Sequence, residues 1–369
     1  MMSSRLAGTI ERYVQNGAFA GAAVVAMHGS RIIAEHYAGT AAPGLASGPT
    51  VLWPVASISK VYTAALIMQL VEQGALTLST PVCEVVPDFR GGGREEMRLR
   101  HLLTHTAGLI YESPEMEQRL KTQTPLPALI EEACRTPLLF SPGTAFKYAD
   151  YNYLLAGYLA EVATGKPFSE LMRQLVLQPG DLGSTFVPPH REDEPRMAKV
   201  RGVLAEGTDG AMYNSRYARE LAHPAFGVFA TARDLASFGS LFTPGGSPVF
   251  SRVCVRAMTT DQTGGVPGTH PSMKGYAADV HIPWGIGFAL QTRQVPSLYC
   301  DLASFRTFGH GGASGCELVI DPTLDLVVAV VSNTHLSTGR ERWYMRMQSI
   351  INRAFAEFAH IAPAALAEA

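Results

Sequence analysis

Ser57 and Lys60 are the first residues of this chain whose types and spacing could do chemistry together. They lie three residues apart, directly before residues 61–73, whose apolar spacing predicts a helix that ends at Gly74. A serine at a helix start most often caps the free N–H groups of the first turn. A lysine one turn later opposes the helix dipole and can reach the serine hydroxyl, so the pair also fits a nucleophile with a proton acceptor. The predicted apolar stripe of this helix comprises Leu66, Ile67, Leu70 and Val71.

Two further groups carry side chains that can move protons or let a substrate approach closely. Tyr148 and Asp150 precede a predicted helix over residues 151–164, where Asp150 could be no more than the N-cap. His310 is followed by two glycines before a predicted strand over residues 317–320, and these glycines could mark a bulge or a close backbone approach. Taken singly, each group has a structural explanation.

The elements that must position these groups begin with a sheet. Residues 22–27 and 31–37, and residues 317–320 and 326–331, are β-capable runs joined by turn residues, which predicts one hairpin near each end of the chain. Helical patterns flank the hairpins in residues 4–15 and 340–358.

The middle of the chain predicts helices over residues 98–103, 126–135 and 151–164, and the proline-rich stretch 187–196 is expected to be a surface loop. We therefore expect an α+β fold. An antiparallel sheet built from both chain ends and flanked by helices is expected to occupy residues 1–80 and 220–369, with a mainly helical subdomain in residues 81–219.

Composition excludes several classes of function. The 369 residues are 47% hydrophobic and 17% charged with a net charge of −2, so we expect neither disorder nor a nucleic-acid partner. No apolar run reaches the roughly 18 residues of a membrane span. The five cysteines lack CxxC spacing, which argues against disulfides and structural zinc. The first residues lack the pattern of a signal peptide, which predicts a cytoplasmic location.

Other chemical sites find little support. His101 and His105 have the spacing of a zinc-binding pair, but Leu102 stands where the metalloprotease motif needs glutamate. The sequence contains neither the G-x-S-x-G turn of α/β-hydrolases nor a phosphate-binding P-loop. We therefore expect no metal and no cofactor.

Together the three groups resemble the three motifs of the penicillin-recognising serine hydrolases, in the branch that holds class C β-lactamases, DD-peptidases and family VIII carboxylesterases. They occur in the family's order and at about its spacing, and residues 102–109, 227–235 and 284–288 are similar to further family segments. The resemblance covers residues 20–333. The three motif matches are Ser57-Ile58-Ser59-Lys60, Tyr148-Ala149-Asp150 and His310-Gly311-Gly312.

The resemblance implies roles for single residues. Ser57 would be the nucleophile, Lys60 its proton acceptor or relay, and Tyr148 the general base and acid. The backbone N–H groups of Ser57 and Ala313 would form the oxyanion hole. Burial should lower the pKa of Lys60, and the neighbouring ammonium should lower the pKa of Tyr148. The expected substrate-binding residues are Asp150, His310, Gly311, Gly312, Trp284, Tyr111 and Tyr151, and the segment 205–225 is expected to form a further pocket wall.

Two departures from the family pattern bear on the substrate. Asp150 stands where the family usually has asparagine, and its carboxylate should hold Lys60 protonated and disfavour amides. His310 replaces a lysine that engages the carboxylate of β-lactams. We therefore expect a serine hydrolase that cleaves small carboxylic esters through an acyl-serine, closest in character to family VIII carboxylesterases.

Several alternatives stay open. The acyl group could pass to an acceptor other than water, which would make the protein a transacylase. A β-lactamase or an amidase or peptidase would use the same mechanism, and a non-catalytic homologue could keep the fold for binding. The expected partner is a small-molecule ester, and the sequence leaves the oligomeric state open.

Overall fold

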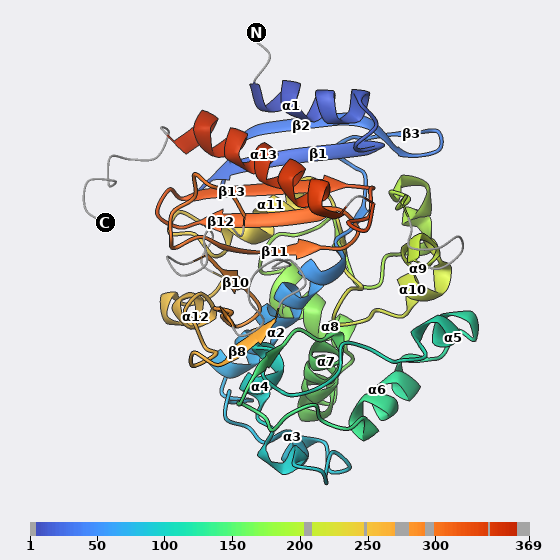
Figure 1. Ribbon diagram of the computed structural model, residues 1–369, viewed down its shortest axis with the longest axis vertical. Helices are drawn as coiled ribbons and strands as arrows, with labels where there is room; N and C mark the ends of the chain where they lie inside the picture. The colour runs from blue at the N-terminus through green and yellow to red at the C-terminus, as the bar shows by residue number, and fades with distance from the viewer. Residues whose placement is uncertain are drawn as a thin grey trace.

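A seven-stranded antiparallel sheet forms the upper layer of the computed structural model (Figure 1). Its strand order is β10-β11-β12-β13-β1-β2-β3, so strands from the two ends of the chain meet where β13 pairs with β1. This confirms the expected sheet and both hairpins. The strands are β1 (Gly21–His28), β2 (Arg31–Ala42), β3 (Leu45–Ala46), β10 (Ala289–Leu290), β11 (Phe308–Gly312), β12 (Cys316–Asp321) and β13 (Leu326–Ser332). The structure describes residues 5–202, 209–246, 249–269, 280–291, 299–338 and 340–359.

Helices cover both faces of this sheet because its strands alternate two apolar faces. In β1, Val24 packs into the cluster that contains residues of α1 (Arg5–Gln15) and α13 (Arg340–Phe358). Val25 points to the opposite side, into the main core with residues of α11 (Ala232–Ser240). A period of two residues along the strand therefore builds two cores at once. Both terminal helices were predicted from the sequence, and Figure 1 shows them together on one face.

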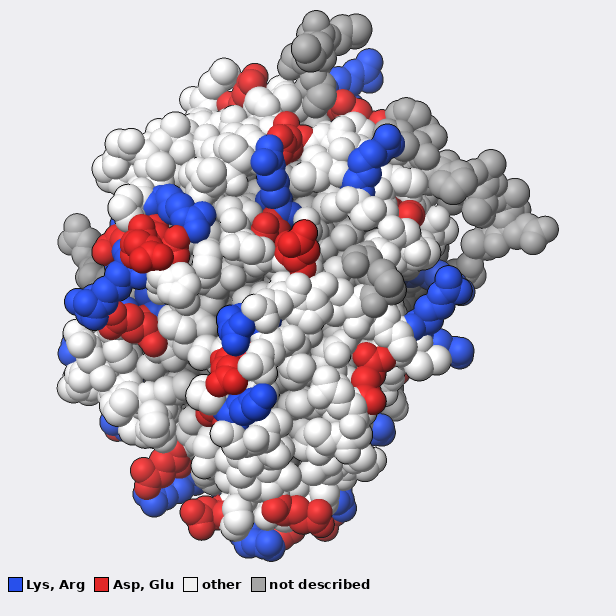
Figure 2. All heavy atoms as spheres, turned by 180° about the vertical axis from the view of Figure 1, so that it is seen from behind, with Lys and Arg blue, Asp and Glu red and all other residues white. Residues whose placement is uncertain are grey.

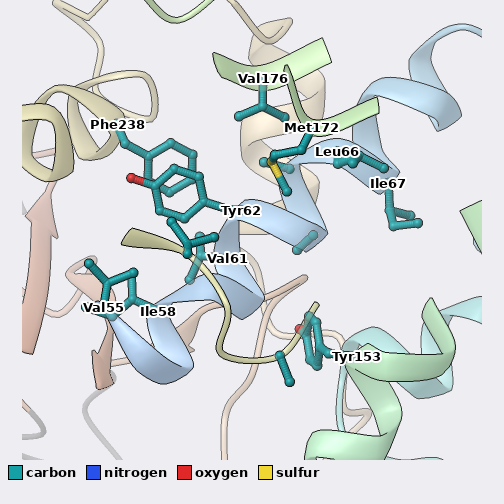
Figure 3. Packing of buried hydrophobic residues seen from close by; sticks show 14 of the residues in the cluster. Val55, Ile58, Val61, Tyr62, Leu66, Ile67, Tyr153, Met172, Val176 and Phe238 are labelled. Atoms are coloured by element: carbon teal, nitrogen blue, oxygen red, sulfur yellow. The ribbon is translucent and has the colours of Figure 1, made fainter. Parts of the chain in front are cut away.

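The helix that follows Ser57 lies between the sheet and the helices below it. Ser57 itself lies in a 3₁₀ turn (Ala56–Ile58) that leads into this helix, α2 (Ser59–Glu72), and eleven of the fourteen residues of α2 are buried. The predicted stripe is confirmed, since Leu66, Ile67 and Leu70 are buried and Val71 is half-buried, and most residues on the other faces of α2 are buried as well. In Figure 3, Tyr62 stacks on Phe238 of α11, with 3.6 Å between ring centroids, while Leu66 lies near Met172.

The lower part of Figure 1 holds the helices of residues 82–172. Those expected from the sequence are α4 (Leu99–Leu103), α6 (Leu126–Arg135) and α7 (Asp150–Thr164). The further helices are α3 (Val82–Val85), α5 (Met116–Lys121), α8 (Phe168–Met172), α9 (Asp209–Asn214), α10 (Arg216–Glu220) and α12 (Arg252–Met258), with a π-helical turn at Arg173–Leu177 and a 3₁₀ turn at Arg94–Glu96. The division into subdomains at residues 81 and 219 stays a prediction.

The stretch 187–196 is more ordered than the expected surface loop. It contains a 3₁₀ turn (Arg191–Arg196) in which the buried Asp193 accepts hydrogen bonds from the Arg196 guanidinium and the His190 N–H. Polar side chains thus satisfy the backbone where prolines prevent a longer helix.

Two small sheets complete the core around the motifs. One joins β4 (Trp53–Pro54), just before Ser57, to β7 (Phe229–Ala230) and β6 (Thr185–Phe186). The other joins β5 (Phe146–Lys147), just before Tyr148, to β8 (Pro267–Thr269) and β9 (Val280–His281). Both motif turns therefore start from a paired strand.

The surface carries mixed charge. On the face in Figure 2, basic and acidic side chains lie beside one another, without a continuous basic patch among the described residues. The pairs Arg233–Glu35 and Arg216–Glu220 are examples of such neighbours in the chain. None of the described helices has the length and apolar character that a membrane crossing requires.

Candidate active site

Ser57 is the one partly exposed residue in an otherwise buried run from Val51 to Lys60. The residue before it, Ala56, adopts φ = 48°, in the left-handed region that non-glycine residues rarely occupy. Such strain persists where the surrounding structure enforces it, and it is common at functional turns. The chain thus presents one hydroxyl at the mouth of a rigid, buried turn.

Strand β11 lies directly against this turn. A Cβ atom at Gly312 would come within 2.3 Å of the Val55 carbonyl oxygen, so only glycine permits the contact. The Ser314 hydroxyl donates to the Pro54 carbonyl oxygen and fastens the residues after β11 to the same segment. Strand β11 thus lies against the turn that carries Ser57, and the oxyanion hole formed by the Ser57 and Ala313 N–H groups stays a prediction. Gly312 is thus needed for a close backbone approach, one of the explanations that the sequence left open, whereas a Cβ at Gly311 would meet the Glu317 side chain.

The Lys60 amine is fully buried and has three oxygen partners. Its Nζ lies 3.0 Å from Ser57 Oγ, 3.2 Å from the Ala225 carbonyl oxygen and 2.7 Å from Asp150 Oδ1. A neutral amine can donate two N–H groups to Ala225 and Asp150 and accept the Ser57 proton on its lone pair. An ammonium can donate to all three oxygens. The pocket therefore accommodates Lys60 before and after it takes a proton.

The balance of burial and charge sets the protonation of Lys60. Burial is the larger influence and lowers the pKa of Lys60 below its usual value, while the Asp150 carboxylate raises it. The Asp150 carboxylate therefore acts on the pKa of Lys60 in the expected direction, and the expectation that it holds Lys60 protonated stays a prediction. Asp150 moderates the effect of burial without reversing it.

Tyr148 completes the cluster around Ser57. Its ring centroid lies 4.9 Å from Lys60 Nζ, and it shares a hydrogen bond with Ser57. Burial raises the pKa of Tyr148 well above the usual value, and the Asp150 carboxylate raises it further. The expectation that the Lys60 ammonium lowers this pKa is therefore wrong. Tyr148 is a neutral phenol at physiological pH, suited to donating a proton.

His105 is a positioning residue that the sequence did not reveal. Its Nδ1 accepts the N–H of Ala149 at 3.1 Å, its carbonyl oxygen accepts the N–H of Lys147, and its ring centroid lies 4.3 Å from that of Tyr148. His101 instead uses Nδ1 to accept the N–H of Arg98. The two histidines therefore serve different turns, and no cluster among the described residues has the side chains to hold a metal.

Asp150 is not the N-cap of α7. Ala149 occupies that position without a side-chain hydrogen bond, and Asp150 is the first helical residue. Its carboxylate lies in the first turn, where the helix dipole favours negative charge, and it points to Lys60 at 2.7 Å. The structural explanation for this residue is therefore wrong, and Asp150 belongs to the Ser57 cluster.

Aromatic rings surround Tyr148. Trp284 and His310 lie edge to face with 5.6 Å between centroids, and both pack near the Tyr148 ring. His310 Nδ1 lies 2.7 Å from the Gly311 carbonyl oxygen, a contact that favours a proton on Nδ1. Tyr111 is 40% exposed, and its ring stacks near Tyr148 at 6.2 Å. These expected substrate-binding residues therefore gather around the cluster.

Tyr151 does not join them. Its side chain is buried in the main core, and its hydroxyl donates to Glu132 Oε1 on α6 at 3.1 Å. The helical turn directs it away from Asp150, so the expectation that Tyr151 lines the substrate site is not supported. Part of the segment 205–225, also expected there, lies outside the described residues.

Two surface hollows lie elsewhere, one of about 370 Å³ beside α5 and α6 and one of about 510 Å³ between α1 and α13. Neither is lined by Ser57, Lys60 or Tyr148. The chemistry of the clustered side chains, and not the size of a cavity, therefore identifies the candidate active site.

Comparison with known proteins assigns this chain to a family. The family model described as Beta-lactamase matches residues 6–350. Penicillin-binding protein 4 of Amycolatopsis lactamdurans is 27% identical over 299 residues, which are 77% of this chain and 72% of the relative. Esterase EstB of Burkholderia gladioli is 26% identical over 371 residues, with 90% of this chain and 91% of the relative covered.

A solved structure described as EstCE1, a hydrolase with promiscuous acyltransferase activity, has the same fold. Its TM-score is 0.76 at 20% identity, covering 94% of this chain and 97% of that one. The resemblance of the three motifs and the match over nearly the whole chain agree. The protein is therefore a serine hydrolase of the Beta-lactamase family, within the penicillin-recognising serine hydrolases.

Proposed function

We propose that this protein is a carboxylesterase that cleaves small esters through an acyl-Ser57 intermediate. The observation that carries the proposal is the partly exposed Ser57 hydroxyl, hydrogen-bonded to a buried Lys60 amine whose pKa is lowered by burial. A neutral amine at hydrogen-bond distance is the activating base that a serine nucleophile needs.

The geometry supports a two-step reaction. Ser57 Oγ attacks the ester carbonyl while its proton passes to Lys60 Nζ, and the N–H groups of Ser57 and Ala313 stabilise the oxyanion. Collapse of the tetrahedral intermediate breaks the bond to the alcohol, which takes a proton from Tyr148. Lys60 then returns its proton to Tyr148. Water, or a second alcohol, releases the acyl group by the reverse sequence.

Charge favours a neutral ester over an anionic β-lactam or an amide. The charge that Lys60 carries when protonated is enclosed, because its side chain is fully buried against Asp150. His310 replaces the lysine that would attract a substrate carboxylate, and the Asp150 carboxylate has no N–H to donate to an amide oxygen. The similarity to EstB, an esterase, and to EstCE1, a hydrolase with acyltransferase activity, supports ester cleavage and acyl transfer.

A covalent label and a substrate panel test the proposal. We expect a fluorophosphonate to add one adduct, seen by intact mass, and the site to be Ser57. We expect p-nitrophenyl esters of graded acyl length to be turned over with a higher kcat/KM than nitrocefin, and added short alcohols to yield a transfer product. Absence of both adduct and turnover would favour a binding homologue, and faster nitrocefin turnover would favour a β-lactamase.

Asp150→Asn tests the charge argument. Removal of the carboxylate removes an attraction that raises the pKa of Lys60, so this pKa should fall further. If neutral Lys60 is the base, activity rises as pH passes upward through this pKa. The acid limb of the kcat/KM profile should therefore move to lower pH in Asp150→Asn. The asparagine N–H can also donate to an amide oxygen, so nitrocefin should gain about tenfold relative to p-nitrophenyl acetate, roughly one hydrogen bond.

The ratio of the two kcat/KM values is its own control, because the fraction of folded enzyme cancels. A ratio that is level or lower in Asp150→Asn, with an unmoved acid limb, would show that Asp150 influences neither Lys60 nor the substrate.

A further inference from the structure

Glu132 on α6 joins three neighbouring segments through one carboxylate. Its Oε1 accepts hydrogen bonds from the Ser113 hydroxyl and, at 3.1 Å, from the Tyr151 hydroxyl. Its Oε2 accepts the Nε–H of Arg119 at 3.0 Å. Burial raises the pKa of Tyr151, and the Glu132 carboxylate raises it further, so the phenol keeps its proton and remains a donor. Hydrogen bonds to an ionised carboxylate are roughly twice as strong as neutral ones.

The partners of Glu132 are immediate neighbours of two site residues. Ser113 lies two positions after Tyr111 in the loop before α5, and Tyr151 directly follows Asp150 at the start of α7. The loop and the helix also touch through the backbone. The Tyr111 carbonyl oxygen accepts the N–H of Asp150 at 2.7 Å and that of Tyr151 at 3.3 Å. One loop residue therefore accepts both N–H groups at the helix start.

The contact between the Ser113 loop and the start of α7 also affects the positions of two site residues, Asp150 and Tyr111. The Asp150 carboxylate forms the ion pair with Lys60 at 2.7 Å, and the partly exposed Tyr111 ring stacks near Tyr148. A shift of the loop relative to α7 would move both at once. A misplacement of about 1 Å by a distant change can cost about 10²-fold in rate.

We propose that Glu132 is a positioning residue for the reaction at Ser57. It holds the Ser113 loop against the start of α7, and thereby sets where Tyr111 faces the substrate and where Asp150 faces Lys60. The inference rests on the proposed ester hydrolysis but concerns a residue that touches neither the nucleophile nor its base.

The surroundings of Glu132 allow the contact to be cut without loss of the fold. Its side chain is 22% exposed and borders the hollow of about 370 Å³ beside α5 and α6. Water can therefore enter and solvate Ser113, Arg119 and Tyr151 after truncation. The preceding residue, Glu131, offers a matched control. It lies on the same helix, 58% exposed, and pairs with Arg135 one turn later.

The experiment compares Glu132→Ala, Glu132→Gln and Glu131→Ala in the full chain. We expect Glu132→Ala to lower kcat/KM for the best p-nitrophenyl ester by about 10–100-fold. KM should rise, because a displaced Tyr111 contacts the substrate less well. The acid limb should move to lower pH, because a loosened Asp150 attracts the Lys60 proton less. Glu132→Gln should recover most of the rate, since its amide oxygen still accepts from Ser113 and Tyr151. Glu131→Ala should stay within twofold of the wild type.

Two outcomes overturn the inference. If Glu132→Ala lowers the melting temperature but matches Glu131→Ala in kcat/KM and in its acid limb, Glu132 serves stability alone. If Glu132→Gln is as impaired as Glu132→Ala, the oxygen that accepts from Ser113 and Tyr151 is not the working contact. The fluorophosphonate labelling rate of Ser57 is read in every variant. A panel without ester turnover would thus contradict the proposed function, while the labelling rates still test Glu132.

Discussion

Ser57→Ala is expected to lower kcat for ester hydrolysis by at least about 10³-fold and to abolish fluorophosphonate labelling. Covalent catalysis needs the Ser57 oxygen, and the Lys60 amine that can take its proton lies 3.0 Å away. Because Ser57 is partly exposed, loss of its oxygen should leave the fold intact. The measurement is kcat for the best p-nitrophenyl ester, with intact mass after labelling and a melting temperature.

The same motif supplies the control for this prediction. Ser59 is buried, and its hydroxyl accepts the Val228 N–H at 3.0 Å, so Ser59→Ala should cost about 1–3 kcal/mol of stability. It should nevertheless keep labelling and turnover. Residual turnover of Ser57→Ala within tenfold of the wild type, or loss of labelling in Ser59→Ala at full folding, would contradict the assignment of Ser57.

The sheet could be predicted because its hairpins are local. The turn between β1 and β2 and the turn between β12 and β13 each join neighbouring runs with turn-forming residues. The burial of α2 could not be predicted in the same way. An apolar stripe was visible, but burial of the other faces of α2 depends on α7, α8 and α11, which are distant in sequence. The sequence period thus predicted one buried face of α2, and tertiary packing determined the burial of the others.

The candidate site likewise has features that the sequence predicted and features that depend on tertiary structure. The family resemblance predicted that Ser57, Lys60 and Tyr148 act together, and the structure places them in one cluster. The sequence could not show that the Ala225 carbonyl oxygen would accept a hydrogen bond from Lys60, because every residue has a backbone carbonyl group and no residue type marks this one. The direction of the pKa shifts also depends on burial, which tertiary structure alone determines. For Tyr148, burial outweighs the neighbouring amine.

Lys60→Met and Tyr148→Phe are each expected to lower kcat by about 10²–10⁴-fold, the usual contribution of general acid–base catalysis. The double variant should lose little more than either single one. Both side chains pass the same proton from Ser57 to the leaving alcohol. Once one of them is removed, proton transfer is already blocked, and removal of the other lowers kcat little further. Losses that multiply would show that the two residues act independently. The measurement is kcat for one ester in all four proteins.

A buried charge must be controlled in this cycle. Lys60→Met leaves the Asp150 carboxylate buried without its cation, which can cost about 3–5 kcal/mol of stability. Lys60→Met with Asp150→Asn removes both charges of the pair and should restore the melting temperature while kcat stays low. Recovery of kcat together with the melting temperature would mean that the loss in Lys60→Met reflects unfolding.

The pH profile then separates the two candidate bases. Since burial lowers the pKa of Lys60 and raises that of Tyr148, the acid limb of the wild-type profile should belong to Lys60. Tyr148→Phe should therefore retain that limb at reduced kcat, because its proton acceptor is unchanged. Lys60→Met should lose it, because the group assigned to this limb has been removed. The opposite pattern, a limb that survives in Lys60→Met and vanishes in Tyr148→Phe, would mean that Ser57 gives its proton to a Tyr148 phenolate.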